Sequence, residues 1–232
     1  MKLTNKILIA AVALVLVATT ALAIKLTSVV RYTPQPMKNG FTEEIKHIAG
    51  VNQLEISGKY EVDIHKGDKD SINIWGPDLL VHKYSEVSVE NRKLTIKSKV
   101  NLSEYGTGVW IQIYLKNLKE LKVSKETAVD VKNMVGDTLK ISASKSANVK
   151  FQSSTYNESF VNVYDNSIVS LEKTKNANVH LEKSAMLIMN LEGGSCSGSQ
   201  ESESLFIVNG KIWRHKVWVS DKVAPKFSEV KK

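Results

Sequence analysis

Two glutamates are the residues of this sequence that most resemble a catalytic pair. Hydrolysis of a glycosidic bond needs two carboxyl groups held a fixed distance apart. Glu172 and Glu192 are twenty residues apart, so a chain that repeats with that period would place them side by side. The alternative is that both are ordinary surface carboxylates, and we favour this second interpretation.

Aromatic side chains offer a second kind of chemistry, because exposed rings can stack on sugars. They can equally complete a hydrophobic core or cap, which is their commoner role. The sequence does not separate the two roles. The candidates are Trp110, Tyr156, Tyr164, Trp213 and Trp218.

Three residues have the side chains of metal ligands and lie close together: His65, Asp68 and Asp70. The segment 66–69 between them reads Lys-Gly-Asp-Lys, which is typical of a β-turn with an aspartate in its usual place. We therefore interpret the group as a turn. The remaining histidines show no ligand spacing, and no G-x-S-x-G motif is present. The sequence predicts no catalytic, cofactor-binding or metal-binding residue, and no cofactor.

The single cysteine, Cys196, excludes an internal disulfide. It lies in the segment 192–204, which reads EGGSCSGSQESES and is too small and polar to form core. We expect a protruding loop or a slack turn of the repeat there, with a free thiol. Pairing of Cys196 with another chain is the alternative.

The charge of the chain argues against nucleic-acid binding. The formal net charge is +8, but it comes almost wholly from lysine, since the arginines are Arg31, Arg92 and Arg214. Bidentate contacts to bases and phosphates favour arginine. The lysines also alternate with acidic residues, which is typical of a solvated surface.

The N-terminus predicts export from the cytoplasm. Lys2 and Lys6 precede an uncharged run from Ile7 to Ile24, eighteen residues long, which is just enough to span a bilayer as a helix. Residues 1–25 are therefore either a signal peptide cleaved after Ala23 or a signal anchor. We favour a single-pass inner-membrane anchor, and cleavage stays open. Both place the rest of the chain in the cell envelope, on the periplasmic or extracellular side.

Alternating apolar and polar residues predict β-strands from Ile48 to Leu115. Short period-two runs are separated by Gly, Asp and Asn, which favour tight turns. No amphipathic helical period follows residue 45.

A twenty-residue repeat follows in three columns of apolar residues. They are Leu121, Ile141, Val161 and Leu181; Val129, Val149, Val169 and Met189; and Val131, Phe151, Leu171 and Leu191. The residues between the last two columns are polar (Asp130, Lys150, Ser170 and Asn190). Val109 and Ile111 extend these two columns backward. Such a period with β-type alternation indicates a solenoid.

These patterns predict an all-β protein. We expect a right-handed parallel β-helix, or solenoid, with coils of about twenty residues, preceded by an N-terminal hydrophobic helix. The expected parts are the signal segment 1–25, a linker 26–45, a β-solenoid domain 46–219 and a tail 220–232. Trp213 and Trp218 are placed to cover the open end of the stack.

Several short segments resemble a known family. Residues 51–67 (VNQLEISGKYEVDIHKG), 72–76 (INIWG), 93–96 (KLTI) and 111–121 (IQIYLKNLKEL) are similar, in order, to the auto-transporter adhesin head domain, or GIN, family. Its members occur largely in envelopes of Bacteroidetes. The resemblance spans about residues 48 to 215 and implies a β-helix fold and an envelope location.

The sequence thus favours a non-enzymatic envelope protein, membrane-tethered or secreted, that presents a binding surface to a protein or a glycan. The alternative is a polysaccharide-active β-helix enzyme. The mixed-sign rows of Lys, Ser, Asn and Glu favour the binding module, because an enzyme would need clustered carboxylates.

Overall fold

A computed structural model of the chain describes residues 41–105, 108–201, 203–220 and 226–228. They belong to one compact unit, residues 39–232. The elements, in chain order, are β1 (Phe41–His47), β2 (Gln53–Ser57), β3 (Tyr60–Lys66), β4 (Ser71–Pro77), η1 (Leu79–Tyr84), β5 (Ser85–Glu90), β6 (Lys93–Ser98), η2 (Leu102–Tyr105), β7 (Val109–Leu115), β8 (Glu120–Ser124), β9 (Ala128–Lys132), β10 (Val135–Ser144), β11 (Asn148–Gln152), β12 (Thr155–Val163), β13 (Ile168–Leu181), β14 (Met186–Glu201), β15 (Leu205–Ser220) and β16 (Lys226–Ser228). The all-β prediction is confirmed.

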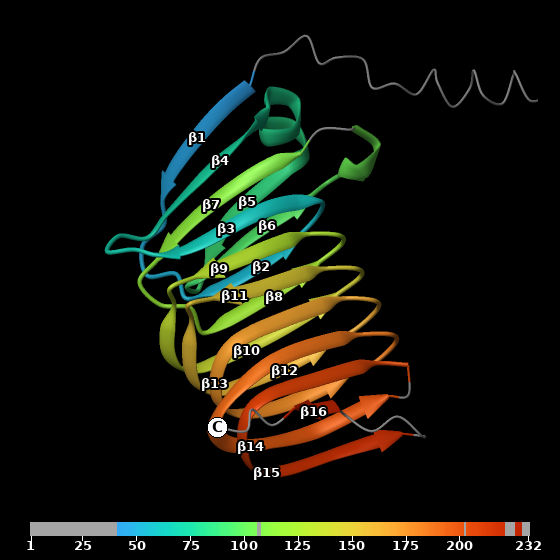
Figure 1. Cartoon of the computed structure of the whole chain (residues 1–232). Coiled ribbons are helices and arrows are strands. Elements are labelled where there is room, and N and C mark those ends of the chain that lie inside the picture. Colours follow the sequence, from blue (N-terminus) through green and yellow to red (C-terminus); the bar gives the residue numbers. More distant parts are fainter. Residues whose placement is uncertain (1–40, 106–107, 202, 221–225, 229–232) are drawn as a thin grey trace, which may run out of the picture. The chain divides into compact units, whose positions relative to one another are not determined.

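The strands lie in two rows that sandwich the core (Figure 1). Face A contains β1, β4, β7, β3, β9 and β11 in that order, and face B contains β5, β6, β2, β8, β10 and β12. The long strand β13 joins the rows, since its first part pairs with β11 and its second part with β12. We call one face A strand and one face B strand, taken together with the corner between them, a coil. Alternate residues of each strand are buried between the faces, which explains the period-two pattern of the sequence.

The twenty-residue register is confirmed over the middle coils. Val129, Val149 and Val169 are partners on adjacent strands, as are Leu121, Ile141 and Val161. All six side chains are at most 2 % exposed. Each strand here pairs in parallel with both neighbours, so every coil covers the apolar edge of the previous one.

The backward extension of the columns is wrong. Ile111 is the partner of Val62, and Val62 is in turn the partner of Val129. The coil of β2 and β3 therefore lies between the coil of β6 and β7 and the coil of β8 and β9. Spacing along the chain predicts a neighbour only where consecutive coils stack directly, and here an earlier coil is inserted between two later ones.

The forward extension is also wrong by two residues. Val161 is the partner of Val179, not of Leu181, and Val169 is the partner of Leu187, not of Met189. Leu171 accordingly pairs with Met189 rather than with Leu191. One coil is thus two residues shorter than the others, which keeps the same face inward because the side-chain period is two.

The glycine- and serine-rich segment is a strand, not the protruding loop that its composition predicts. Residues 192–201 are part of β14, which pairs with β13 and β15. A Cβ atom at Gly194 or Gly198 would lie 1.8 Å from a carbonyl oxygen of β13. Small residues occur here because the backbones approach closely, and not because the segment is solvated.

Two left-handed residues in succession form the corners that follow β8, β10, β12 and β13. Lys125 and Glu126, then Lys145 and Ser146, have φ angles of 57° to 62°. The same pair recurs at residues 165–166 and 183–184. The amides of Glu126, Ser146 and Asn166 each donate to a carbonyl of the next corner at 2.9–3.0 Å. These bonds between coils offset the cost of left-handed backbone for residues with a side chain.

Buried hydroxyl groups complete the corners. Ser167 Oγ accepts from the amide of Ala147 at 3.1 Å. Thr127 is fully buried, and its hydroxyl is shared between the carbonyl oxygens of Gly58 and Ser124. The hydroxyl thus serves two backbone acceptors at the corner, and the carbonyl of Ser124 also accepts from the amide of Gly58 at 3.3 Å.

The ends of the domain differ from the sequence prediction. Strand β1 begins at Phe41, inside the expected linker, and β16 lies inside the expected tail. The short helices η1 and η2 have too few turns to give a helical period. Trp218 is 72 % exposed, so it does not cover the core as expected, and the side chain of Trp213 is outside the description.

The expected N-terminal helix and signal segment, residues 1–25, lie outside the described residues. Within the part of the chain that the structure describes, no helix is long and apolar enough to cross a membrane.

The buried hydroxyl of Thr127 should contribute to stability through its hydrogen bonds. We expect Thr127→Val to lower the free energy of unfolding by about 1–3 kcal/mol, because the carbonyl oxygens of Gly58 and Ser124 lose the hydroxyl that donates to them. Urea unfolding measures the change. Thr95→Val, at an outward position of β6, is the matched control and should be nearly neutral. Equal losses in the two variants would contradict this role of Thr127.

Close backbone approach at Gly198 gives a second test. Gly198→Ala should destabilise by about 1–3 kcal/mol or more, since the new methyl group overlaps the carbonyl of Val179. Gly108→Ala is the control, because its Cβ would meet the Trp110 ring at 3.7 Å, an ordinary contact. Thermal unfolding of both variants compares them, and a Gly198→Ala protein as stable as Gly108→Ala would show that β13 and β14 are not so close.

Candidate functional site

Face A carries a hollow of about 320 Å³ that is lined by residues of β3, β4, β7, β9 and β11. One row of outward side chains crosses it from strand to strand. The row consists of Trp75 of β4, Trp110 of β7, Glu61 of β3, Ala128 of β9 and Asn148 of β11. Neighbouring strands are about 4.8 Å apart, so side chains in one row are in reach of each other.

A small residue in a row of large ones creates this hollow. Ala128 lies between Glu61 and Asn148, and its methyl group leaves the floor at that strand uncovered. The two tryptophans at the other end of the row stand higher above the sheet, because an indole is much larger than a methyl group. The hollow thus has one aromatic end and a low floor.

A hydrogen bond fixes one of the two indoles. Nε1 of Trp110 donates to Oε2 of Glu61 at 2.7 Å. Both residues are held on central strands of the face, where their backbones pair on two sides. The ring of Trp110 is therefore positioned before any ligand arrives, which reduces the entropy cost of binding.

A second row of side chains gives the hollow its charges. Asp63, Asp130 and Lys150 are successive partners on β3, β9 and β11. Lys132 forms an ion pair with Asp63, and this carboxylate raises the pKa of the Lys132 ammonium group. The floor thus presents hydrogen-bond acceptors and donors next to each other.

The expected carboxylate pair does not form. The carboxylate of Glu172 accepts a hydrogen bond from the amide of Ser153, whereas Glu192 lies 3.3 Å from the ammonium of Lys173. A register shift between β13 and β14 after Leu171 separates the two glutamates. Each carboxylate has its own partner, as their interpretation as surface residues expects.

Two of the three residues considered as metal ligands have other partners. Asp70 accepts from the amide of Gly50 at 2.8 Å and from the amide of Lys116 at 2.9 Å. The ring of His65 stacks on Tyr114 with centroids 5.4 Å apart. Among the described residues, no group of three or more His, Cys, Asp or Glu side chains could hold a metal ion.

The structure brings together a serine, a histidine and a glutamate that sequence reasoning did not connect. His180 of β13 contacts Ser199 of β14 through Nδ1 and Glu182 through Nε2. Tyr164 packs edge-on against the histidine ring at 5.7 Å. Ser199 pairs with strands on both sides, so the surrounding amides serve the ladder and cannot stabilise an oxyanion. Acyl transfer at Ser199 therefore has no structural support.

Two of the other candidate residues are buried. Tyr156 is 2 % exposed, and burial raises the pKa of its hydroxyl. Cys196 is 1 % exposed in β14, and burial raises the pKa of its thiol to about 12. The thiol of Cys196 is free, as expected, but it lies in a strand and not in a loop. Its burial in the core disfavours the alternative of pairing with another chain. A thiol with so high a pKa is a poor nucleophile.

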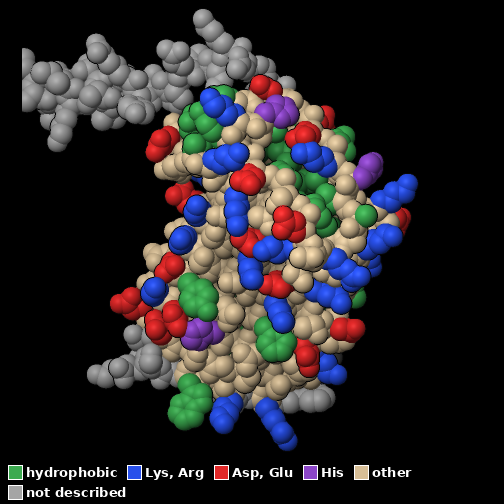
Figure 2. All heavy atoms as spheres, turned by 180° about the vertical axis from the view of Figure 1, so that it is seen from behind, with side chains coloured by type: hydrophobic (Ala, Val, Ile, Leu, Met, Phe, Trp, Pro, Cys, Tyr) green, Lys and Arg blue, Asp and Glu red, His purple; other side chains and the backbone are tan. Residues whose placement is uncertain are grey.

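Face B is covered by alternating charges, and Figure 2 shows lysine and carboxylate side chains interleaved across the middle of the molecule seen from behind. Glu55 of β2 is its best-defined anion. Lys93 and Lys97 lie 2.7 and 2.8 Å from its carboxylate, and their hydrogen bonds lower its pKa from 4.5 to about 2. The folded state therefore favours the ionised form of Glu55.

This shift predicts a pH dependence of stability. The contribution of Glu55 is complete above pH 4.5, its ordinary pKa, and is lost as the pH falls towards 2. We expect Glu55→Gln to make the free energy of unfolding less dependent on pH in that window. Urea titrations at several pH values measure this. Lys93→Gln/Lys97→Gln should remove the same dependence, and parallel acid curves for Glu55→Gln and the unaltered protein would contradict the prediction.

Sequence reasoning missed most of the hollow. Of its lining residues, Trp110 was singled out beforehand as a sugar-stacking ring, and Asp130 and Lys150 as members of an outward row. Trp75 and Glu61 reach the site because β4 and β3 flank β7, an order that the spacing along the chain does not reveal. A signal that could have found them is the presence of two tryptophans on strands predicted to alternate in and out.

Two solved structures share the fold. One, described as a "putative adhesin" from Bacteroides fragilis, has a TM-score of 0.65 and 14% identity, and the match covers 84% of this chain and 99% of that one. Another, from Parabacteroides merdae, has a TM-score of 0.53 and 15% identity over 84% of this chain and 98% of that one. No curated protein matches the sequence.

A family model matches residues 51–190, from just before β2 to within β14. This range covers more than half of the chain and includes every strand that lines the hollow. It also agrees with the order of segments that resembled the GIN family. The chain therefore belongs to the family described as "Putative auto-transporter adhesin, head GIN domain".

Proposed function

We propose that this chain is a non-enzymatic cell-envelope protein, membrane-tethered or secreted, that binds a glycan at the hollow of face A. The observation that carries the proposal is the juxtaposition of Trp75 and Trp110 with the carboxylates of the second row. Indole faces bind the apolar faces of sugar rings, while neighbouring polar groups bind the hydroxyls. The description of the family as adhesins supports a binding role.

The mixed charges of the floor favour a neutral glycan. Glu61, Asp63 and Asp130 would repel an acidic sugar, whereas Lys132 and Lys150 would repel a cationic ligand. Sugar hydroxyls both donate and accept, so they can serve the carboxylates and the ammonium groups together. A protein segment remains the other possible ligand class for such a face.

The fold would present this hollow on a rigid support. We infer that the stacked coils form a right-handed solenoid, since parallel strands in one sheet are connected in that hand in about 98% of cases. The hydrophobic segment 1–25 would deliver the domain across a membrane and, if uncleaved, hold it there. Mass spectrometry of the mature N-terminus distinguishes the anchor from cleavage after Ala23.

A polysaccharide-active enzyme is the second candidate. It is favoured by one observation, the alignment of Asp63 and Asp130 on adjacent strands at the floor of the hollow. A glycosidase needs one carboxyl that is free to deliver a proton. Asp63 is held by Lys132 and Glu61 by Trp110, so the binding function is better supported.

Variants of the hollow test the binding proposal. On an array of neutral glycans, Trp75→Ala should weaken capture by about ten-fold or more, as loss of a buried aromatic contact does. Ala128→Phe should abolish capture, because the phenyl ring fills the floor of the hollow while every polar group stays in place. Both positions face outward, so the fold should be retained.

Two controls accompany these variants. Trp218→Ala removes a tryptophan that is exposed elsewhere, and Ser142→Phe adds a ring on face B. Neither should change glycan capture. Capture that is unaffected by Trp75→Ala and Ala128→Phe would overturn the proposal. Release of reducing ends that stops in Asp63→Asn or Asp130→Asn would establish the enzyme instead.

A further inference from the structure

A second hollow, of about 580 Å³, lies at the corners of the coils. It is bordered by the turn between β2 and β3, the corner between β8 and β9, the next corner between β10 and β11, and η2. Four lysines line it: Lys59, Lys99, Lys125 and Lys145. Among the described residues of the lining, Glu126 is the only acidic one.

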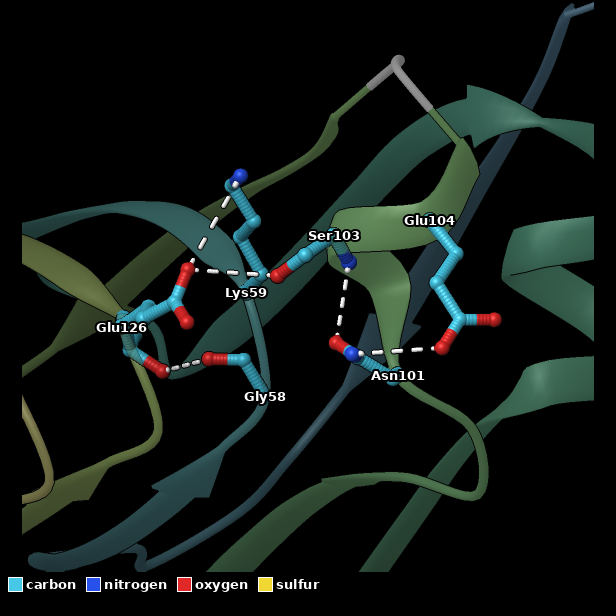
Figure 3. A network of polar contacts seen from close by, with 7 residues as sticks. Gly58, Lys59, Asn101, Ser103, Glu104 and Glu126 are labelled. Carbon is cyan, nitrogen blue, oxygen red and sulfur yellow. Dashed lines mark hydrogen bonds and ion pairs between the residues drawn. The ribbon is translucent and has the colours of Figure 1, made fainter. Parts of the chain in front are cut away.

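The single carboxylate is already engaged. Glu126 accepts a hydrogen bond from the hydroxyl of Ser103 at 3.2 Å and lies 3.8 Å from the ammonium of Lys59. Figure 3 shows these contacts at the rim, with Lys59 and Ser103 converging on Glu126 from the β2–β3 turn and from η2. Within the described residues, no ion pair holds Lys99, Lys125 or Lys145.

A second acidic residue, Glu104 of η2, forms its hydrogen bond within its own segment. Glu104 accepts from the side-chain amide of Asn101 at 3.4 Å, and Asn101 in turn accepts from the amide of Ser103 at 3.2 Å. These bonds lie within residues 101–104 and occupy the carboxylate of Glu104. They leave the positive charge of the hollow in excess.

The architecture of the corner brings two of these charges together. Lys125 and Lys145 hold the same left-handed position on consecutive coils, and the amide of Glu126 bonds to the carbonyl of Lys145 at 3.0 Å. Like charges at such adjacent positions are unfavourable. On the coil after Lys145 the same position holds Asp165, which forms an ion pair of 3.4 Å with Lys183 one coil further along.

We propose that this hollow binds a phosphate group carried on a sugar-sized body. Lysine ammonium groups bind phosphate as point charges, and the excess of lysines supplies the complementary field. The volume falls in the range of small-molecule sites. The hydroxyl of Ser146, at the same corner as Lys145, provides a polar group for the hydroxyls of a sugar.

The site shares no lining residue with the hollow of face A. It takes an anion where the other favours a neutral ligand, so the two proposals stand or fall separately. The phosphate can belong to a free saccharide or to a lipid headgroup, and the experiment distinguishes these sources.

Titration calorimetry of the full chain with glucose 6-phosphate tests the proposal, with glucose as the uncharged probe. Lys125→Asn and Lys145→Asn each remove one charge, and asparagine tolerates the left-handed backbone. Each should weaken binding by about ten-fold, and added salt should weaken it further. Lys183→Asn changes the same corner position outside the hollow and should alter binding by no more than about two-fold.

Vesicles identify the source of the phosphate. The same variants are compared on phosphatidylcholine vesicles with and without phosphatidylglycerol. The comparison shows whether phosphatidylglycerol increases binding of the protein to the vesicles. If glucose 6-phosphate does not bind, but phosphatidylglycerol increases vesicle binding only when Lys125 and Lys145 are present, the phosphate is that of a lipid headgroup. If neither probe depends on these lysines, or if Lys183→Asn has an equal effect, the proposal is wrong.

Folding of the variants is checked by thermal unfolding. Lys99→Gln provides an independent test, since Lys99 lies outside the left-handed corners and its replacement strains no backbone. It should weaken binding of glucose 6-phosphate as the corner variants do. If Lys99→Gln and every correctly folded corner variant bind glucose 6-phosphate as tightly as the unaltered protein does, the proposal is wrong.

Discussion

The backbone hydrogen bonds between successive coils are the constraint on which the rest of the structure depends. A strand in the middle of the stack must pair its backbone amides and carbonyls with a strand on each side. Each coil therefore has to begin and end in register with its neighbours. The corners deliver this by a fixed pair of left-handed residues, such as Lys125 and Glu126, and not by a particular side chain. Buried hydroxyls of Thr127, Ser154 and Ser167 then satisfy the backbone groups that remain.

The same constraint separates structural from functional residues. Inward positions must stay apolar, as Val129, Val149 and Val169 do, because one polar residue there would be buried without a partner. Outward and corner positions are free to vary, and the stack lines them up in rows. A single small residue, Ala128, then makes a hollow, and two corner lysines make a concentrated charge. Sites arise on this fold from the order of residues across strands.

The sequence was sufficient for the fold class and for the register of the middle coils, since Leu121, Ile141 and Val161 repeat where consecutive coils stack. It could not predict the insertion of β2 and β3 between later coils, because no local pattern records which strand lies beside another. It also misassigned residues 192–201, where small residues indicate close backbone approach as readily as they indicate a loop. The two hollows share this difficulty: Trp75 and Glu61, or Lys59 and Lys145, are brought together only by strand order.

The inserted coil has a consequence for how the chain reaches its native state. Strands β2 and β3 find their partners only when β6, β7, β8 and β9 are present, so their contacts are distant in the chain. Folds dominated by such distant pairings form slowly, and partly folded forms expose unpaired strand edges. Later coils can add one by one onto a finished neighbour, as in other repeat proteins. We therefore expect the part of the chain up to β9 to form slowly, and the C-terminal coils to extend the template that it provides.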